Sequence, residues 1–152
     1  MVMYMYNNNL RYCREEIGMT QKELGYVFGV SDSAVRAWET ARDAMPLPKL
    51  IKFCNLYNYS LDFAIGLNRK NIQYGKFNTN KDKISAKLKE LRTTLKISQQ
   101  SLCDKCKISQ TTYSGYETGK YMINTTNLFY ICKTFNISMD WIVGRTKNMN
   151  TK

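Results

Sequence analysis

Apolar residues recur along the chain at intervals of three and four positions, and short polar segments interrupt them. Leu10, Cys13 and Ile17 have this spacing near the start of the chain. It places apolar side chains on one face of an α-helix, whereas a half-buried strand would alternate at every second residue. The chain contains no convincing run of the second kind. The pattern therefore predicts an all-α protein made of short helices.

The whole pattern occurs twice. Residues 10–66 align without a gap with residues 88–144, an offset of 78 positions, and thirteen of the 57 aligned pairs are identical. A unit of this length is too long for a solenoid repeat, so the duplication predicts two small domains in tandem. The identical residues, numbered in the first copy, are Leu10, Arg14, Gln21, Leu24, Ser31, Glu39, Thr40, Leu50, Cys54, Asn58, Ser60, Asp62 and Gly66.

Capping residues divide each copy into five helices. Thr20, with Glu23 three residues later, forms a capping-box pattern at the start of the second helix, and Ser98 starts the matching helix of the second copy. Ser31 and Ser109 are good N-caps for the third helix after a tight turn. The fourth and fifth helices follow at 49–57 and from 60 in the first copy, and at 127–135 and from 138 in the second.

A polar stretch rich in Asn, Lys, Gln and Gly lies between the copies at residues 67–82. This composition is typical of a linker with at most a fragment of helix. The predicted organisation is a first domain at 1–66, a linker at 67–82, a second domain at 83–147 and a tail at 148–152.

The charge of the chain points to a partner. Twenty-three Lys and Arg against 12 Asp and Glu give a net charge of +11, which favours a polyanion, nucleic acid first. Residues 1–66 are neutral, with seven basic and seven acidic side chains. The linker has a net charge of +3 and residues 83–152 have +8. We therefore expect the second copy to supply most of the affinity for nucleic acid.

The absence of histidine argues against an enzyme, because it removes the usual general base and the usual imidazole zinc site. We expect no cofactor and no metal. Cys103 and Cys106 form an isolated C-x-x-C, but they align with Gly25 and Phe28 and are read as packing residues. No apolar run approaches the roughly 20 residues that span a bilayer, and the start of the chain does not look like a signal peptide. These features predict a cytoplasmic, nucleoid-associated protein with no membrane partner.

Both copies resemble a known family. The segments 20–25 and 29–39, and again 98–102 and 108–120, look like the helix-turn-helix of phage repressors (Cro/XRE type). Residues 136–144 are similar to the last helix of that family. The resemblance covers nearly the whole chain apart from the linker and tails. It implies two lambda-repressor-like domains of five helices, and a sequence-specific regulator of transcription, a repressor of bacterial or phage type that binds double-stranded DNA.

The resemblance also implies site residues. The start of helix two would meet a phosphate, helix three would lie in the major groove, and the residues after helix three would hold the DNA backbone. Glutamine suits adenine, threonine the thymine methyl group, arginine guanine, and aspartate the amino group of cytosine. The implied DNA-binding residues are Gln21, Asp32, Ser33, Arg36, Ala37 and Arg42 in the first copy, and Gln99, Gln110, Thr111, Ser114, Gly115, Lys120 and Tyr121 in the second.

Two pairs of opposite charge share a separation of 25 residues: Arg14 with Glu39, and Arg92 with Glu117. In the family an equivalent pair ties the first helix to the third. We predict that both are structural ion pairs and at least partly buried.

Two functions remain open from the sequence. The first is a DNA-binding regulator that acts as a homodimer, or as a single chain whose two copies form a pseudo-dimer. The second is a protein-interaction module, such as an antitoxin-like or anti-repressor scaffold, in which one or both motifs no longer bind DNA. Asp32 at the head of a neutral copy's third helix keeps the second function open. A steep fall of affinity with salt would favour the first.

Overall fold

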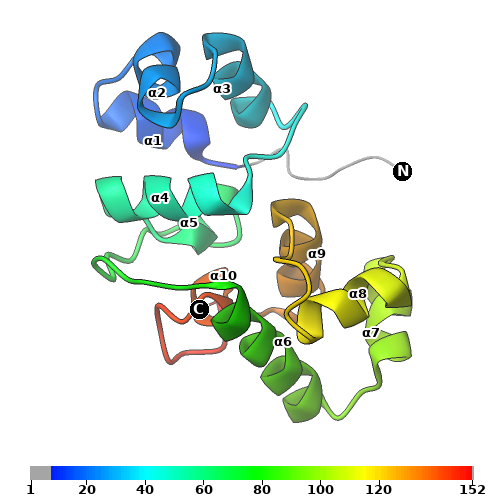
Figure 1. The fold of residues 1–152 in the computed structure, drawn as a ribbon. Helices are drawn as coiled ribbons and strands as arrows, with labels where there is room; N and C mark the ends of the chain where they lie inside the picture. Colours follow the sequence, from blue (N-terminus) through cyan, green and yellow to red (C-terminus); the bar gives the residue numbers. More distant parts are fainter. Residues whose placement is uncertain (1–7, 152) are drawn as a thin grey trace. The chain divides into compact units, whose positions relative to one another are not determined.

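The structure is a computed structural model that describes residues 8–151 (Figure 1). In this range the chain forms ten α-helices and no strand, and its one isolated β-bridge joins Ile137 to Asn150. The all-α prediction is confirmed. The helices are α1 (Leu10–Glu16), α2 (Gln21–Phe28), α3 (Asp32–Glu39), α4 (Leu47–Tyr57), α5 (Leu61–Ile65), α6 (Lys81–Leu95), α7 (Gln99–Cys106), α8 (Gln110–Glu117), α9 (Thr125–Phe135) and α10 (Met139–Ile142).

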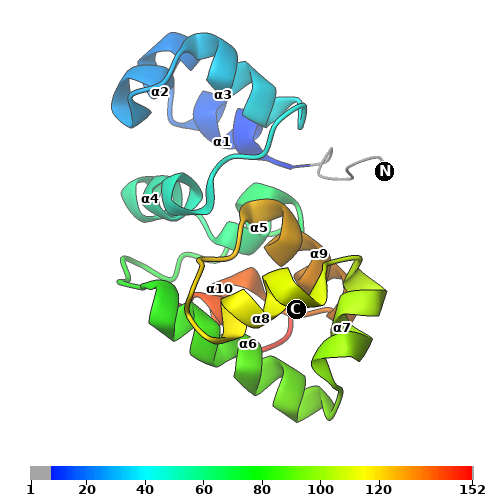
Figure 2. The same cartoon turned by 45° about the vertical axis from the view of Figure 1, so that its right-hand side comes forward.

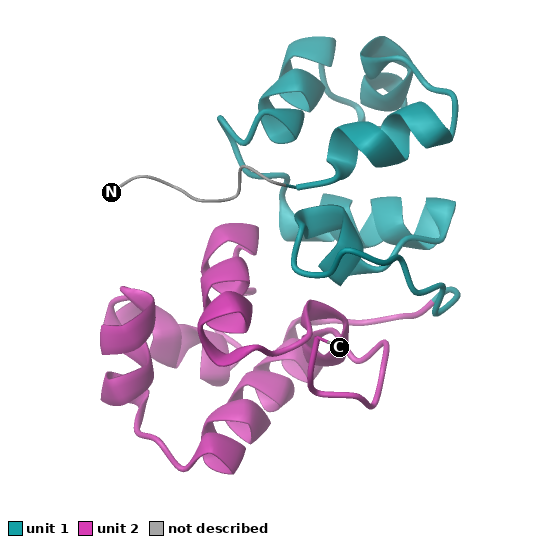
Figure 3. Ribbon diagram, turned by 180° about the vertical axis from the view of Figure 1, so that it is seen from behind, with its two compact units in different colours: residues 1–76 teal, residues 77–152 magenta. Residues whose placement is uncertain are grey.

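The chain divides into two compact units, residues 1–76 and 77–152 (Figure 3). The first contains α1–α5 and the second α6–α10, so each copy of the repeat forms a five-helix unit. The second unit starts earlier than the repeat suggested, because α6 begins at Lys81, inside the segment assigned to the linker. The reason is local: the Asn80 side chain accepts a hydrogen bond from the Lys83 N–H at 2.9 Å and caps the helix.

Hydroxyl side chains start the helices at the positions that the sequence indicated. Thr20 accepts a hydrogen bond from the Glu23 N–H, and the Glu23 carboxylate accepts one from the Thr20 N–H, which completes the capping box. Ser31 caps α3 and Ser109 caps α8 in the same way as Ser98 caps α7. Each cap satisfies a backbone N–H that has no partner within its helix.

The core of each unit lies between its helix-turn-helix and the helices that flank it. In the first unit Trp38 packs edge-to-face on Phe28, which also contacts Phe53. In the second unit Tyr113 is fully buried and packs against Tyr116. The contacts of Phe28 hold α2 against α3 and α4, and the Tyr113 hydroxyl donates to the Leu88 carbonyl at 3.5 Å, which ties α8 to α6.

The segment expected to be a tail packs against the second unit. The Ser138 N–H donates to the Met149 carbonyl at 2.7 Å, beside the Ile137–Asn150 bridge. Just before this segment, Arg145 forms a buried ion pair with Asp140, and its guanidinium lies 4.8 Å from the ring centroid of Phe77. Residues at both ends of the unit therefore contribute to its packing.

Replacing Ala41 with Gly is expected to stabilise the first unit by about 1 kcal/mol. Ala41 ends α3 in the left-handed conformation (φ 58°), which is costly for a residue with a Cβ, and its counterpart in the second unit is Gly119 (φ 76°). The converse change, Gly119→Ala, is expected to destabilise the second unit, where the new Cβ would lie 3.0 Å from Asp82 Oδ1. Urea unfolding of both variants measures the two effects. A loss of stability in Ala41→Gly would contradict the explanation.

Candidate nucleic-acid interface

Each unit presents two short helices joined by a tight turn. In the first unit α2 ends at Gly29 in the left-handed conformation, and the Val30 N–H donates to the Gly25 carbonyl at 2.9 Å. A Cβ at Gly25 would lie 2.6 Å from the Val30 carbonyl oxygen, so the turn fits closely over this glycine. The second unit makes the same turn with Lys107 in the left-handed conformation. Both turns set α3 and α8 across the preceding helix.

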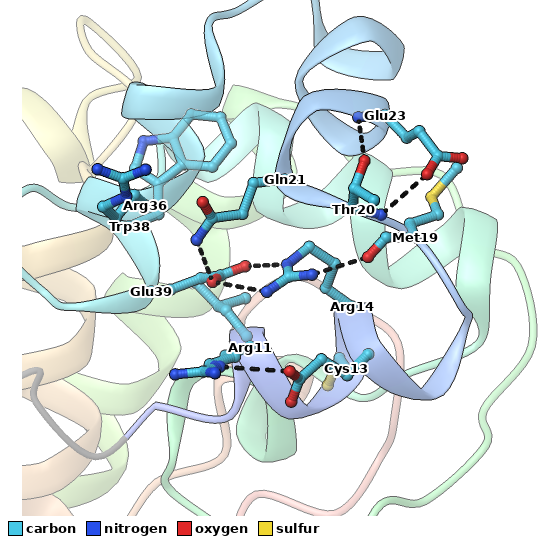
Figure 4. A network of polar contacts seen from close by, with 12 residues as sticks. Arg11, Cys13, Arg14, Met19, Thr20, Gln21, Glu23, Arg36, Trp38 and Glu39 are labelled. Atoms are coloured by element: carbon cyan, nitrogen blue, oxygen red, sulfur yellow. Dashed lines mark hydrogen bonds and ion pairs between the residues drawn. The ribbon is translucent and has the colours of Figure 1, made fainter.

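A buried ion pair fixes α3 against α1 in the first unit (Figure 4). Arg14 Nε lies 2.5 Å from Glu39 Oε2, and Arg14 Nη2 donates to Glu39 Oε1 at 3.2 Å. The Arg14 guanidinium also donates to the Met19 carbonyl at 2.7 Å. The side chains are 9% and 3% exposed, respectively. The bidentate geometry gives the pair directional rigidity as well as charge compensation.

The second unit repeats this arrangement with Arg92 and Glu117. Arg92 Nε lies 2.7 Å from Glu117 Oε2, and Nη2 donates to Oε1 at 3.0 Å. Arg92 is more exposed than its counterpart, at 20%, while Glu117 is 4% exposed. Burial alone would raise the pKa of Glu117, but hydrogen bonds from Arg92, Tyr113 and Gln99 outweigh it and hold this pKa below the usual value.

The two glutamines that open α2 and α7 lie against these carboxylates. Gln21 Nε2 donates to Glu39 Oε1 at 3.0 Å (Figure 4), and Gln99 Nε2 donates to Glu117 Oε1 at 3.1 Å. Both side chains are partly buried. The structure thus gives each glutamine a role in orienting the third helix of its unit. The phosphate contact predicted for the start of each of these helices stays a prediction.

The exposed face of α3 carries three of the nominated residues, namely Asp32, Ser33 and Arg36. Ala37 does not belong with them, although it follows Ser33 by four positions: it is buried in the core, and the loop after α3 returns to it, where the Asp43 N–H donates to the Ala37 carbonyl at 3.1 Å. Asp32 Oδ1 accepts a hydrogen bond from the Ser33 N–H at 2.9 Å. Its carboxylate therefore sits at the positive end of the α3 dipole, where a phosphate would otherwise be attracted.

An open depression of about 460 Å³ lies on the exposed face of α8. Gln110 and Thr111 are exposed at its helix start and Ser114 is half-exposed. Gly115 is buried, because the ring of Tyr121 covers it, so it is not available as a contact in its own right. The depression is lined by Gln110, Thr111, Ser114, Gly115, Thr118, Lys120 and Tyr121.

Thr118 is the lining residue that the sequence reasoning missed. It follows Thr111 by seven positions and Ser114 by four, and this spacing places all three on one side of α8. The helical period was therefore the signal that would have identified it.

The residues that follow α3 and α8 are exposed, as a contact with the DNA backbone requires. Arg42 is exposed in the first unit, and Lys120 and Tyr121 are exposed in the second. Lys120 Nζ lies 5.3 Å from the ring centroid of Tyr121, so the charge and the ring form one local surface.

Comparison with known proteins places this geometry in a family. The family model HTH_3, described as helix-turn-helix, matches residues 10–63 and again residues 88–142. The chain belongs to the helix-turn-helix family. Its two matches coincide with the two units of the structure, and the resemblance to Cro/XRE-type proteins is confirmed for both copies. A helix-turn-helix is a DNA-binding element whose second helix enters the major groove.

A curated relative of this helix-turn-helix protein is named as an uncharacterized HTH-type transcriptional regulator, YobD, of Bacillus subtilis (strain 168). The two are 32% identical over 63 residues, which is 41% of this chain. The aligned part spans 56% of the length of the relative. No solved structure matches the chain.

Cys103 and Cys106 are both buried free thiols, and burial raises the pKa of each. Across residues 8–151, no group of three or more His, Cys, Asp or Glu side chains is placed to hold a metal ion. None of the helices in that range is long and apolar enough to span a membrane.

Proposed function

We propose that the protein is a sequence-specific regulator of transcription that binds double-stranded DNA, with α8 and α3 as its recognition helices. The observation that carries the proposal is the exposed face of α8. Gln110, Thr111 and Ser114 surround an open depression there, and Lys120 stands at its edge. Amide and hydroxyl side chains on a helix that fits the major groove are the groups that read base edges. A lysine beside them supplies attraction to phosphate.

The second unit is the main source of affinity in this proposal. Residues 83–152 have a net charge of +8, whereas residues 1–66 are neutral. Asp32, held at the start of α3, adds repulsion toward phosphates on the surface where the second unit has Gln110. The first unit would then add selectivity through Ser33 and Arg36, which are exposed on α3.

A second function, confined to the first unit, is favoured by the Asp32 carboxylate at the start of α3. An acidic group at the N-terminus of α3 suits a protein partner with basic side chains better than it suits a nucleic acid. In this alternative the second unit binds DNA and the first recruits or binds a protein.

Repression is the regulatory outcome we propose. A chain with two helix-turn-helix units covers two sites on DNA, and occupancy of a promoter excludes other proteins from it. Because one chain carries both units, it can act as a pseudo-dimer, and a homodimer is the alternative assembly.

The test is a selection of duplexes from a random library with the full chain, followed by binding assays between 50 and 200 mM salt. We expect a preferred sequence, and a log–log salt slope of about −0.9 for each phosphate contact. Lys120→Ala should weaken binding to all sequences alike and make the slope less steep by about one. Lys133→Ala is the matched control, because this exposed lysine lies in the last turn of α9, far along that helix from the Lys120 loop.

Two results would contradict the proposal. Selection without enrichment of any sequence would exclude sequence-specific recognition. Affinity that does not change with salt would exclude a phosphate-binding surface and favour the protein-interaction module.

A further inference from the structure

The loop after α8 folds back onto the recognition helix. The Lys120 and Tyr121 N–H groups both donate to the Gly115 carbonyl, at 2.9 and 3.2 Å. This double contact ties the loop between α8 and α9 (Figure 2) to the second half of α8, where Gly115 has no side chain of its own. The Tyr121 ring lies directly over that position.

The ring fills the space that a side chain at position 115 would occupy. A Cβ at Gly115 would lie 2.4 Å from Tyr121 Cδ2 and 2.5 Å from Cε2, well inside van der Waals contact. Gly115 follows Thr111 by four residues and precedes Thr118 by three, so it belongs to the same side of the helix as both. Tyr121 therefore stands between two residues of the exposed face, although it comes from outside the helix.

The exposed part of the ring borders the depression on α8. Tyr121 is 46% exposed and lines the depression together with Thr111 and Thr118. Lys120 Nζ, 5.3 Å from the ring centroid, brings positive charge to the same place. The aromatic ring and the two threonine methyl groups bring apolar atoms into a surface whose other lining residues are polar.

The first unit has the fold-back but not the ring. The Asp43 N–H donates to the Ala37 carbonyl at 3.1 Å, as Tyr121 does to Gly115. Asp43, which aligns with Tyr121, directs its carboxylate to the Ala44 N–H at 2.9 Å instead. The combination of a glycine in the helix with an aromatic residue in the loop is thus specific to the second unit.

We infer that Tyr121 is a specificity-determining residue that replaces the missing side chain at position 115 and contacts the C5-methyl group of a thymine in the major groove. The inference rests on the proposed function, since it assumes that α8 enters that groove. The thymine methyl is the one apolar feature of a base-pair edge in the major groove, and an apolar side chain is its usual partner.

Thymine-to-uracil exchange in the selected duplex tests the inference, because it removes only the methyl group. Each thymine is replaced in turn, and affinity is measured for the wild-type full chain and for Tyr121→Ala and Tyr121→Phe. At one position we expect uracil to weaken wild-type binding by about fourfold, the effect of removing one methyl group from contact. Tyr121→Phe keeps the ring and should keep this sensitivity, whereas Tyr121→Ala should lose it.

Gly115→Ala is the second variant, because its Cβ would displace the ring without removing it. It should also abolish the sensitivity to uracil, and Ala37→Gly in the first unit is its matched control. Thermal unfolding and affinity for a shuffled duplex establish that the variants are folded.

The inference is overturned if wild type and Tyr121→Ala respond equally to uracil at every position, or if Tyr121→Phe behaves like Tyr121→Ala. In both cases a preferred sequence is still selected and the proposed function stands. If the wild-type chain selects no sequence, the proposed function fails and the inference fails with it.

Discussion

Replacing Arg14 with Met is expected to lower the free energy of unfolding of the first unit by about 3–5 kcal/mol. The change leaves Glu39 buried, at 3% exposure, with only the Gln21 amide as a hydrogen-bond donor among its former partners. A buried carboxylate that has lost its counter-ion keeps its desolvation penalty without the attraction that offset it. The α1–α3 contact that positions the exposed face of α3 would be weakened at the same time.

Urea unfolding measures this loss. The protein has two tryptophans, Trp38 in the first unit and Trp141 in the second. In a Trp141→Phe background the fluorescence of Trp38 reports on the first unit alone. The double variant Arg14→Met, Glu39→Leu is the control, and it should recover most of the loss because no unpaired charge remains.

The equivalent change in the second unit should cost less. The Arg92 side chain is 20% exposed, so after the change Arg92→Met water can partly solvate the Glu117 carboxylate that has lost its partner.

Equal and small losses in the single and double variants of the first unit would contradict the role assigned to the Arg14–Glu39 pair.

Replacing Gln110 and Thr111 together with Ala should remove most of the base preference of the second unit. Both side chains are exposed at the start of α8 and line its depression. One bidentate contact to a base discriminates by about 1–3 kcal/mol, so we expect roughly a thirtyfold loss of affinity for the selected sequence. Affinity for a shuffled duplex should be almost unchanged, because neither residue carries charge. Fluorescence anisotropy with both duplexes measures the difference.

Asp32→Ala is the matched control in the first unit, where Asp32 aligns with Gln110. This variant loses a negative charge from the start of α3, so we expect it to bind all duplexes somewhat more tightly. If the change in α8 weakens selected and shuffled duplexes equally, the two residues do not read bases.

The sequence predicted the elements better than the exposed faces. Alignment of the repeat with itself found both helix-turn-helix units, and the caps at Thr20 and Ser31 located the helix starts, because these signals are local. Ala37 and Gly115 were nominated by their place in a motif. Whether such a residue faces solvent depends on how the helix is rotated on its neighbours and, for Gly115, on a ring from the following loop.

Longer-range contacts were also outside what the sequence could supply. The hydrogen bonds from Gln21 and Gln99 to the ion-paired glutamates join residues 18 positions apart. No local pattern distinguishes a glutamine that bonds inward from one that faces a phosphate. The start of α6 was missed for a different reason, because its cap, Asn80, lies in a stretch where asparagine is common.

The network that holds the third helix of each unit is the same in both units, while the residues at the exposed surface differ. Arginine, glutamine and glutamate occur at equivalent positions, Arg14, Gln21 and Glu39 matching Arg92, Gln99 and Glu117. A homodimer has to present two identical surfaces and therefore reads a palindrome. A chain whose two copies have diverged at the surface is free of this symmetry. Its target sequence is accordingly expected to consist of two unlike halves, with the half bound by α8 the more strongly defined.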